Sequence, residues 1–251
     1  MRFVAVIPAA GQATRLGDIK SSKEVVPVAI GQLPVQRPRV AMDCLLEGLG
    51  LCDTDRVFVV LREGKWDIVS HIGDGRDRGL NVAYLVMQYS RGVPFTFDQA
   101  FPFVKECSVL FGFPDILFRP RTAFQRLVKR IETGSADLVL GVFPTDRPHK
   151  FDMVQFDQNS RVSHLEIKSG STMLKYAWAI AAWRPSFTNY LHNYLRADSE
   201  SDVNPESPEL YLGNVIQAAI DEGMVGEVEI FSKGEVLDIG TPEDLKRAQS
   251  F

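Results

Sequence analysis

The stretch that decides the fold stands near the start of the chain: Phe3-Val4-Ala5-Val6-Ile7-Pro8-Ala9-Ala10-Gly11-Gln12-Ala13-Thr14-Arg15. It begins with a short apolar run bounded by turn residues, which is typical of a buried strand. The small residues after this run let the backbone approach a ligand closely, and their N–H groups can face phosphate oxygens. We therefore expect the loop from Ala9 through Ala10, Gly11 and Gln12 to Ala13 to bind a phosphorylated ligand.

The alternation of strand and helix patterns continues to about residue 145. Four further buried strands and one amphipathic helix are predicted, at Arg56–Leu61, Val82–Met87, Ser108–Phe113, Asp137–Phe143 and Arg121–Thr133. A second apolar helical stripe follows Pro38 and ends at Gly50. Strand–helix–strand repetition implies right-handed crossovers and a mostly parallel sheet with helices on both faces. The fold class is therefore α/β.

The pattern changes from about residue 146. Met153–Phe156 and Arg161–Ile167 alternate apolar and polar residues around a turn sequence, which predicts a β-hairpin. The rest of the sequence predicts a strand at Lys175–Trp183, a helix from Pro185 and a polar loop at Ala197–Pro208. It then predicts a helix at Glu209–Glu222, strands near Val228–Phe231 and Val236–Leu237, and a last helix capped by Thr241. With no linker or repeat, we expect one domain over residues 1–251, in which the hairpin forms a smaller sub-lobe.

The composition is that of an ordinary globular protein. Hydrophobic residues make up 45% and charged residues 24% of the 251 residues, and the net charge is −4. A slightly acidic chain is a poor match for nucleic acid or an anionic membrane, and we expect neither as a partner. Three cysteines without a CxxC pair and four scattered histidines argue against a disulfide framework and a zinc site. No apolar run approaches the ~20 residues of a membrane span, so we expect a cytoplasmic protein.

Two cations and two acids stand where a phosphorylated ligand would need them. Arg15 and Lys23 lie within nine residues of each other, after the small-residue loop. Asp115 follows the apolar strand that begins at Ser108, and Asp238 lies in Leu237-Asp238-Ile239-Gly240-Thr241. Mg²⁺ is typically held by one or two carboxylates together with ligand phosphates. The pattern therefore predicts Mg²⁺ at Asp115 and Asp238.

Together these segments resemble the sugar-1-phosphate nucleotidylyltransferases, and they are most similar to the thymidylyl- and uridylyltransferase branches. The loop with Arg15 matches the GxGTRL signature of that family, and Ser22–Val28 matches its SKxLLPV or PKExLPI element. Leu165–Lys168 resembles its EEKP or VEKP segment, and Leu237-Asp238-Ile239-Gly240-Thr241 its LDTGT segment. The resemblance covers essentially the whole chain and implies a Rossmann-like fold of the nucleotide-diphospho-sugar transferase type.

The resemblance implies an activity and a role for each motif. A nucleoside triphosphate, dTTP or UTP by preference, and a sugar-1-phosphate would give a nucleoside-diphosphate sugar and pyrophosphate. Arg15 and Lys23 would act at the triphosphate, Lys168 at the sugar phosphate, and Gln88 and Gly92 at the pyrimidine base. The nucleotide-binding part would be about residues 1–145 and the sugar-phosphate-binding part about 146–251. A homo-oligomer is also expected.

The expected sugar pocket departs from the family pattern. Phe151-Asp152 replaces an aromatic–glycine pair, Ile167 replaces a glutamate, and Trp178 replaces a small apolar residue. We therefore assign Asp152, Lys168 and Trp178 to sugar-phosphate binding. These changes predict that unmodified glucose-1-phosphate is a mediocre substrate.

Three alternatives stay open at this point. A cytidylyltransferase acting on another phosphomonoester would keep the chemistry and change the acceptor. A nucleotide-sugar-binding module without turnover would keep the pocket, although binding alone would not obviously need both carboxylates. A dinucleotide oxidoreductase would need a GxGxxG motif and an acid about 20 residues beyond it, and the glycines of that motif are missing.

Overall fold

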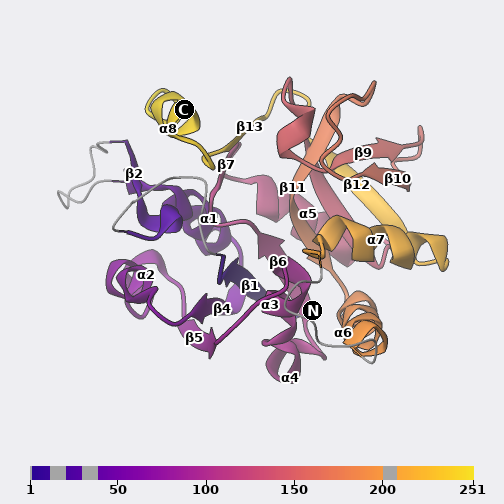
Figure 1. Cartoon of the computed structure of the whole chain (residues 1–251). Helices are drawn as coiled ribbons and strands as arrows, with labels where there is room; N and C mark the ends of the chain where they lie inside the picture. The colour runs from indigo at the N-terminus through magenta and orange to yellow at the C-terminus, as the bar shows by residue number, and fades with distance from the viewer. Residues whose placement is uncertain (1, 12–20, 30–38, 200–207) are drawn as a thin grey trace.

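The computed structural model describes residues 2–11, 21–29, 39–199 and 208–251. Within these ranges the chain builds a nine-stranded sheet (Figure 1). Strand β1 (Phe3–Ala9) lies between β4 (Thr54–Arg62) and β6 (Ser108–Gly112), and β5 (Val82–Met87) extends the sheet beyond β4. All of these neighbours run parallel. The predicted parallel α/β arrangement of the first half is confirmed.

Strand β11 (Tyr176–Trp183) makes the sheet a mixed one. It runs antiparallel to β8 (Leu138–Pro144) along one side, and on the other side to β6 at its end and to β9 (Met153–Phe156) at its start. β9 and β10 (Val162–Glu166) form the predicted hairpin, and β12 (Gly226–Ile230) adds in parallel to β8. The β9–β10 hairpin therefore adds a smaller antiparallel part to the central sheet, next to the start of β11.

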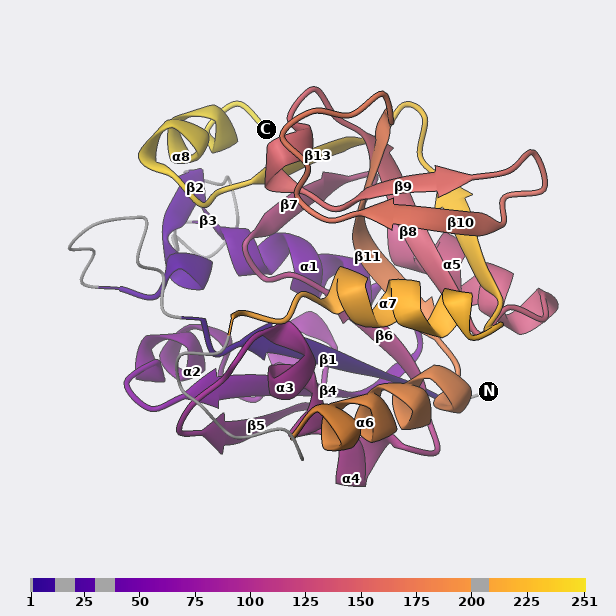
Figure 2. The same cartoon turned by 45° about the vertical axis from the view of Figure 1, so that its right-hand side comes forward.

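Helices cover both faces of the sheet, as Figure 2 shows. One face carries α1 (Ala41–Gly50), α2 (Trp66–Ile72), α5 (Ala123–Thr133) and α8 (Pro242–Ala248). The other face carries α3 (Val93–Asp98), α4 (Phe101–Val104), α6 (Pro185–Ser199) and α7 (Leu212–Asp221). Because successive strand residues point to opposite faces, Ala5 and Ile7 of β1 pack in the first core and Val4 and Val6 in the second.

Two short ladders lie outside the main sheet. β7 (Ile116–Arg119) pairs with β13 (Glu235–Asp238), and β2 (Pro27–Ala29) pairs with β3 (Arg39–Val40), both antiparallel. Three 3₁₀ turns, η2 (Lys23–Val25), η3 (Arg76–Arg78) and η4 (Pro148–Lys150), complete the described elements. The β7–β13 ladder matters most for the site, because it carries the C-terminal segment back to the end of β6.

Several helical boundaries differ from the sequence prediction. The short helices α2, α3 and α4 were not predicted, because four to seven residues are too few to establish a helical period. The helix predicted from Glu209 begins at Leu212, and before it the backbone N–H of Leu210 donates to the Arg91 carbonyl. Helix α6 extends to Ser199, so the first three residues of the loop predicted at Ala197–Pro208 are helical, and residues 200–207 lie outside the described ranges. No helix among the described residues is long and apolar enough to cross a membrane.

Candidate active site

A cavity of about 510 Å³ opens at the carboxyl ends of the parallel strands. This is the edge where open α/β sheets bind their ligands. The first half of the chain contributes the predicted residues Ala10, Gly11, Lys23, Gln88 and Gly92, together with Asp115. The second half contributes the other four: Asp152, Lys168, Trp178 and Asp238. Residues predicted separately from five distant segments therefore line one cavity.

Four predicted residues are placed elsewhere or not described. The Ala9 side chain is fully buried in the core on the α1 side of the sheet and does not line the cavity. Gln12, Ala13 and Arg15 belong to the segment 12–20, which lies outside the described residues. Their predicted roles stay predictions.

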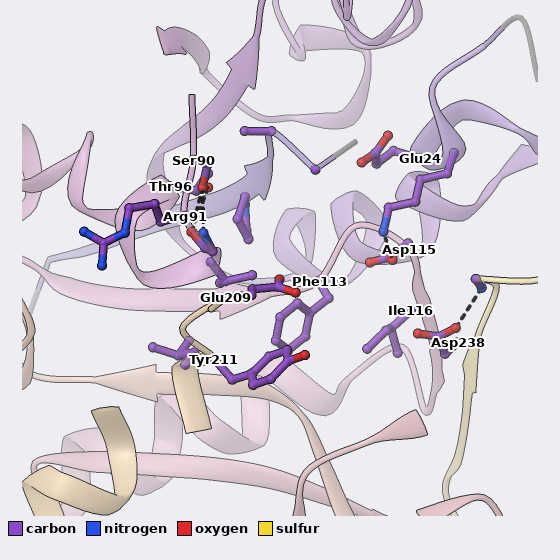
Figure 3. A pocket seen from close by; sticks show the side chains of 18 of the residues that line it. Glu24, Ser90, Arg91, Thr96, Phe113, Asp115, Ile116, Glu209, Tyr211 and Asp238 are labelled. Carbon is purple, nitrogen blue, oxygen red and sulfur yellow. Dashed lines mark hydrogen bonds and ion pairs between the residues drawn. The ribbon is translucent and has the colours of Figure 1, made fainter. Parts of the chain in front are cut away.

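The two predicted metal carboxylates come together through the β7–β13 ladder. Asp115 follows β6 by three residues, directly before β7, and Asp238 pairs with Ile116 across the ladder. The backbone N–H of Ile239 donates to the Asp115 carbonyl at 3.1 Å, which closes the ladder beside the acids. Figure 3 shows Asp115 and Asp238 toward one end of the cavity and Ser90, Arg91 and Thr96 toward the other.

Lys23 lies against the first of these acids. Its Nζ atom is 2.5 Å from Oδ2 of Asp115. Burial alone lowers the pKa of Lys23, but the charge of Asp115 and its hydrogen bond outweigh burial and raise that pKa. The Asp115 pKa is lowered, because the Lys23 ammonium outweighs the opposite effect of burial. Burial, and then repulsion from Asp115, raise the pKa of Asp238. One lysine therefore balances only part of the charge of two carboxylates.

The donor set fits Mg²⁺. Both carboxylates reach the cavity, with 13% of the Asp115 side chain and 21% of the Asp238 side chain exposed. Among the described residues no group of three His, Cys, Asp or Glu side chains could hold a metal alone. Two hard oxygen ligands that repel each other suit a cation that takes its remaining ligands from phosphates and water.

The backbone on both sides of Lys23 is held by the start of α2. Asp67 accepts hydrogen bonds from the backbone N–H of Ser22 at 2.6 Å and from its hydroxyl at 2.7 Å. On the other side, Nζ of Lys65 lies 2.7 Å from Oε1 of Glu24, and both residues are almost fully buried. Burial raises the pKa of Glu24 and lowers that of Lys65, while each partner's charge acts in the opposite direction. Asp67 and Lys65 therefore fix the turn that presents Lys23.

A second lysine supports the Asp238 side of the site. Nζ of Lys150 lies 2.7 Å from the buried Asp244 carboxylate of α8 and 3.9 Å from Oδ1 of Asp238. Asp244 also accepts from Arg147 and from the Thr241 hydroxyl. These contacts anchor the last helix beside the acids, with the predicted cap at Thr241 in place.

The end of the cavity away from the two acids is shaped by the loop after β5 (Figure 3). The Ser90 hydroxyl lies 2.7 Å from both the Gly92 carbonyl oxygen and the Thr96 hydroxyl. Gly92 has a φ of +134°, and a Cβ atom there would lie 2.2 Å from the carbonyl oxygen of Leu210. Only glycine fits this position without displacing the 209–211 segment, which brings Glu209 and Tyr211 into the cavity.

The predicted sugar-phosphate residues Asp152, Lys168 and Trp178 line the same cavity. Lys168 follows β10 with a φ of +44°, and its Nζ atom lies 4.1 Å from the centre of the Tyr211 ring. The backbone N–H of Trp178 donates to the Asp152 carbonyl at 3.3 Å. Burial raises the pKa of Asp152 to about 6, although the Lys168 charge and N–H groups of Lys168 and Trp178 act against burial.

The comparison with known families agrees with this geometry. The family model described as "Nucleotidyl transferase" matches residues 4–251, almost the whole chain and every segment that lines the cavity. The protein is a member of the nucleotidyl transferase family. The resemblance inferred from the motifs is thereby confirmed, and with it the prediction that this nucleotidyltransferase is an enzyme.

Named relatives are distant in sequence. The chain is 24% identical over 250 residues to the glucose-1-phosphate thymidylyltransferase of Neisseria meningitidis, covering 98% of this chain and 81% of that one. It is 23% identical to the low-salt glycan biosynthesis nucleotidyltransferase Agl11 of Haloferax volcanii, covering 97% of this chain and 64% of that relative.

Two solved structures share the fold of this nucleotidyltransferase. One is a Bacillus anthracis protein provisionally assigned as a glucose-1-phosphate thymidylyltransferase, solved with sucrose. Its TM-score is 0.80 at 20% identity, with 99% of this chain and 94% of that one covered. The other is the inositol-1-phosphate CTP transferase of T. maritima, with a TM-score of 0.72 at 20% identity, covering 100% and 95% of the two chains.

Sequence reasoning missed several residues of the nucleotidyltransferase cavity. Lys150, Glu209 and Tyr211 line the cavity but were not singled out, and neither was Lys65, which pairs with the buried Glu24. Glu24 carried a usable signal, because an acid inside an apolar turn needs a buried partner. The identity of that partner could not be predicted, since 41 residues separate the two in the sequence.

Proposed function

We propose that this enzyme transfers a nucleotidyl group from a pyrimidine nucleoside triphosphate, dTTP or UTP by preference, to a sugar-1-phosphate, and releases pyrophosphate. The observation that carries the proposal is a single cavity lined by Lys23, Asp115 and Asp238 together with Lys168 and Asp152. The named relative from Neisseria, matched over almost the whole chain, supports the same reaction type.

The nucleotide would lie along the ends of the parallel strands. Ala10 and Gly11 expose their backbone to the cavity next to Lys23, which suits the triphosphate. Gln88 lines the other end, and its amide can both donate to and accept from a pyrimidine edge. We assign Arg15, from the undescribed segment, to the triphosphate on its motif alone. In this proposal residues 1–145 mainly bind the nucleotide and residues 146–251 mainly bind the sugar phosphate.

The chemical step requires positioning and charge more than proton transfer. A phosphomonoester is mostly dianionic at pH 7, because its second pKa is about 6, so the attacking oxygen needs no base. That oxygen forms a bond to the α-phosphorus as the bond to the pyrophosphate oxygen breaks, and pyrophosphate leaves with the negative charge. Lys23 and Lys168 would hold the two phosphate groups in line and offset their repulsion.

Asp115 and Asp238 would hold Mg²⁺ in this scheme. When bound, the ion would neutralise phosphate charge beyond what the lysines supply. The protein itself contributes two fixed elements to this metal site. The β7–β13 ladder holds the two carboxylates, and the turn with Lys23 places an ammonium group against Asp115. The absence of nucleic acid and membrane partners, the cytoplasmic location and the homo-oligomer stay predictions.

The test is a panel of substrates assayed for pyrophosphate release. dTTP, UTP, CTP and ATP are each offered with hexose-1-phosphates, a pentose-1-phosphate, an inositol phosphate and phosphocholine, and the product is identified by mass spectrometry. A nucleoside-diphosphate sugar from dTTP or UTP is the expected product. Turnover confined to CTP with a non-sugar acceptor would replace this proposal by the cytidylyltransferase alternative, and no release with any pair would favour a binding module.

A further inference from the structure

The main sheet keeps one edge that no described strand covers. The strand order ends at β5, which pairs with β4 and with no other described strand, and Figures 1 and 2 show it at the rim of the sheet. At the other side, β10 and β12 meet through a bridge between Arg161 and Glu227, and the backbone N–H of Val228 donates to the Ser160 carbonyl at 2.8 Å. The hairpin therefore closes that side, and β5 stays open.

The backbone of β5 presents hydrogen-bonding groups along this open edge. The N–H of Val82 donates to the Asp74 carbonyl at 3.1 Å, so the backbone of Val82 points away from β4. Because alternate residues of a strand share one direction, the N–H and C=O groups of Tyr84 and Val86 point outward as well. Neither residue has a backbone hydrogen bond on that side within the described ranges. These outward groups can pair with another strand.

The edge lacks the features that usually protect an open sheet. Natural proteins guard such edges with lysine, proline or a β-bulge, because an unguarded edge pairs readily with a further strand. Strand β5 contains no proline, and its register with β4 runs without a shift. The whole segment from Gly79 to Ser90 carries no charged residue, although 24% of the chain is charged. The edge is therefore suited to pairing.

Apolar side chains are exposed on and beside this strand. Val86 of β5 is 53% exposed, and so is Trp66 at the start of α2. Phe103 of α4 is 54% exposed, and its ring lies 5.6 Å from the ring of Phe58 in β4, the strand next to the edge. A covered aromatic side chain buries roughly 150–250 Å², so these side chains add apolar area to the strand edge. A protein interface buries area of this kind.

We propose that two copies of this chain pair their β5 strands antiparallel about a two-fold axis and so join their main sheets. Tyr84 of each copy lies opposite Val86 of the other, and Leu85 lies at the axis. In this register the outward N–H and C=O groups of Tyr84 and Val86 bond across the axis, while the N–H of Val82 keeps its bond to Asp74. The inference concerns assembly and does not depend on the proposed reaction.

The charge pattern favours a second copy as the occupant. A two-fold axis brings residues close to their own copies, so any charge near the axis would meet its like and be repelled. The uncharged segment Gly79–Ser90 avoids this repulsion over its whole length. Tyr84 against Val86 of the second copy is also a favourable cross-strand pair of an aromatic and a β-branched side chain. A strongly charged partner would find no opposite charge on β5.

The first test measures mass by sedimentation equilibrium over a range of protein concentrations. We expect the wild type to form dimers, or a larger assembly made of them. Val86→Pro removes an outward N–H, which an edge strand tolerates, and should halve the mass while circular dichroism stays unchanged. Val86→Lys sets two lysines about 7–8 Å apart across the axis and should have the same effect, so it serves if Val86→Pro does not fold. Met173→Lys, at a 94% exposed side chain before β11, is the control and should keep the wild-type mass.

The second test checks the register by oxidative cross-linking. Residues opposite each other in a pair without hydrogen bonds have Cα atoms about 4.5 Å apart, within the range that a disulfide spans. Leu85→Cys should therefore give a covalent dimer on a non-reducing gel. Ala83→Cys should not, because Ala83 lies opposite Met87 of the second copy. The wild type is run in parallel, since it has three cysteines of its own.

Several outcomes would overturn the proposal. One is a wild-type monomer at every concentration, and another is an assembly that keeps its mass in folded Val86→Pro or Val86→Lys. Cross-linking through Ala83→Cys rather than Leu85→Cys would contradict the register. A monomer that binds a different protein, and loses it in Val86→Lys, would assign the edge to that protein. None of these measurements needs turnover, so their failure leaves the proposed function untouched.

Discussion

The two ends of the cavity differ in how their polar groups are satisfied. At the phosphate end the named charged groups meet a partner: Lys23 meets Asp115, Lys65 meets Glu24, and Lys150 meets Asp244. Oε2 of Glu24 is nevertheless left without a hydrogen bond to any described residue, and at the acceptor wall burial raises the pKa of the Asp152 carboxylate to about 6. The first end therefore holds its charges in ion pairs, whereas at the second end burial dominates the pKa of the carboxylate that lines the cavity.

This difference follows from what each end has to do. Phosphates are common to all substrates of such a reaction, so fixed charges can be arranged in advance and need no reorganisation during the reaction. An acceptor is recognised by its own pattern of hydroxyls, which requires groups that pair only when the right molecule is bound. Changes at the phosphate end should therefore affect folding and turnover, and changes at the acceptor wall should affect selectivity.

The largest expected effect concerns the buried pair behind Lys23. Lys65→Met leaves the Glu24 carboxylate buried without its cation, and breaking such a pair typically costs about 3–5 kcal/mol. Glu24→Gln combined with Lys65→Met removes the charge as well and should recover most of the loss. Urea unfolding of the wild type, both single variants and the double variant gives the coupling energy. Additive losses would show that the two side chains do not depend on each other.

Next in size is the effect of the metal carboxylates on turnover. Asp115→Asn and Asp238→Asn should each lower kcat by about 10²–10³, because charge that stabilises the transition state is lost. A chelator should abolish wild-type turnover, and added Mg²⁺ should restore it. Asp74→Asn, an exposed carboxylate far from the cavity lining, is the control. A rate within threefold of the wild type would remove the altered residue from the site.

A smaller effect should separate the two lysines. Lys168→Ala is expected to weaken sugar-phosphate binding about tenfold, roughly 1.4 kcal/mol, while nucleoside triphosphate binding changes less than twofold. Calorimetry with each ligand alone measures both. Lys175→Ala is the matched control, since Lys175 is exposed and does not line the cavity. Equal losses for both ligands would contradict the division between the two ends.

The smallest effect is a dependence of stability on pH at the acceptor wall. Burial raises the pKa of Asp152 from 3.8 to about 6, so between about pH 4 and pH 6 the folded state binds more protons than the unfolded state. The free energy of unfolding contributed by this group is thus fully present below pH 4 and is lost as the pH rises through 6.

The substitution Asp152→Asn removes this loss of folding stability at higher pH. The variant should exceed the wild type by about 1 kcal/mol at pH 7.5 and match it near pH 4, while Asp74→Asn should show no such difference. Thermal unfolding across this pH range provides the measurement. A variant that is less stable than the wild type at pH 7.5 would mean that the Asp152 carboxylate already has the partners it needs.

Much of the fold follows from local pattern. Short apolar runs bounded by turns predicted β1, β4, β5, β6 and β8 to within two residues at each boundary, since such runs are typical of strands in a parallel sheet. The hairpin of β9 and β10 followed from alternation around a turn sequence. The helices α3 and α4 were not predicted, because their six and four residues show too little helical periodicity and each helix includes a proline.

The sequence by itself determined the residue types of the site and the edge of the sheet where most of them lie. Small residues, lysines and acids after apolar strands specify phosphate chemistry, and parallel strands place their carboxyl ends together. Only the tertiary structure decided the pairings: that Asp238 meets Asp115 through β7 and β13, that Lys65 pairs with Glu24, and that Lys150 pairs with Asp244. The reason is physical, since such pairings depend on strand register and side-chain direction between segments distant in the chain, which local propensity does not encode.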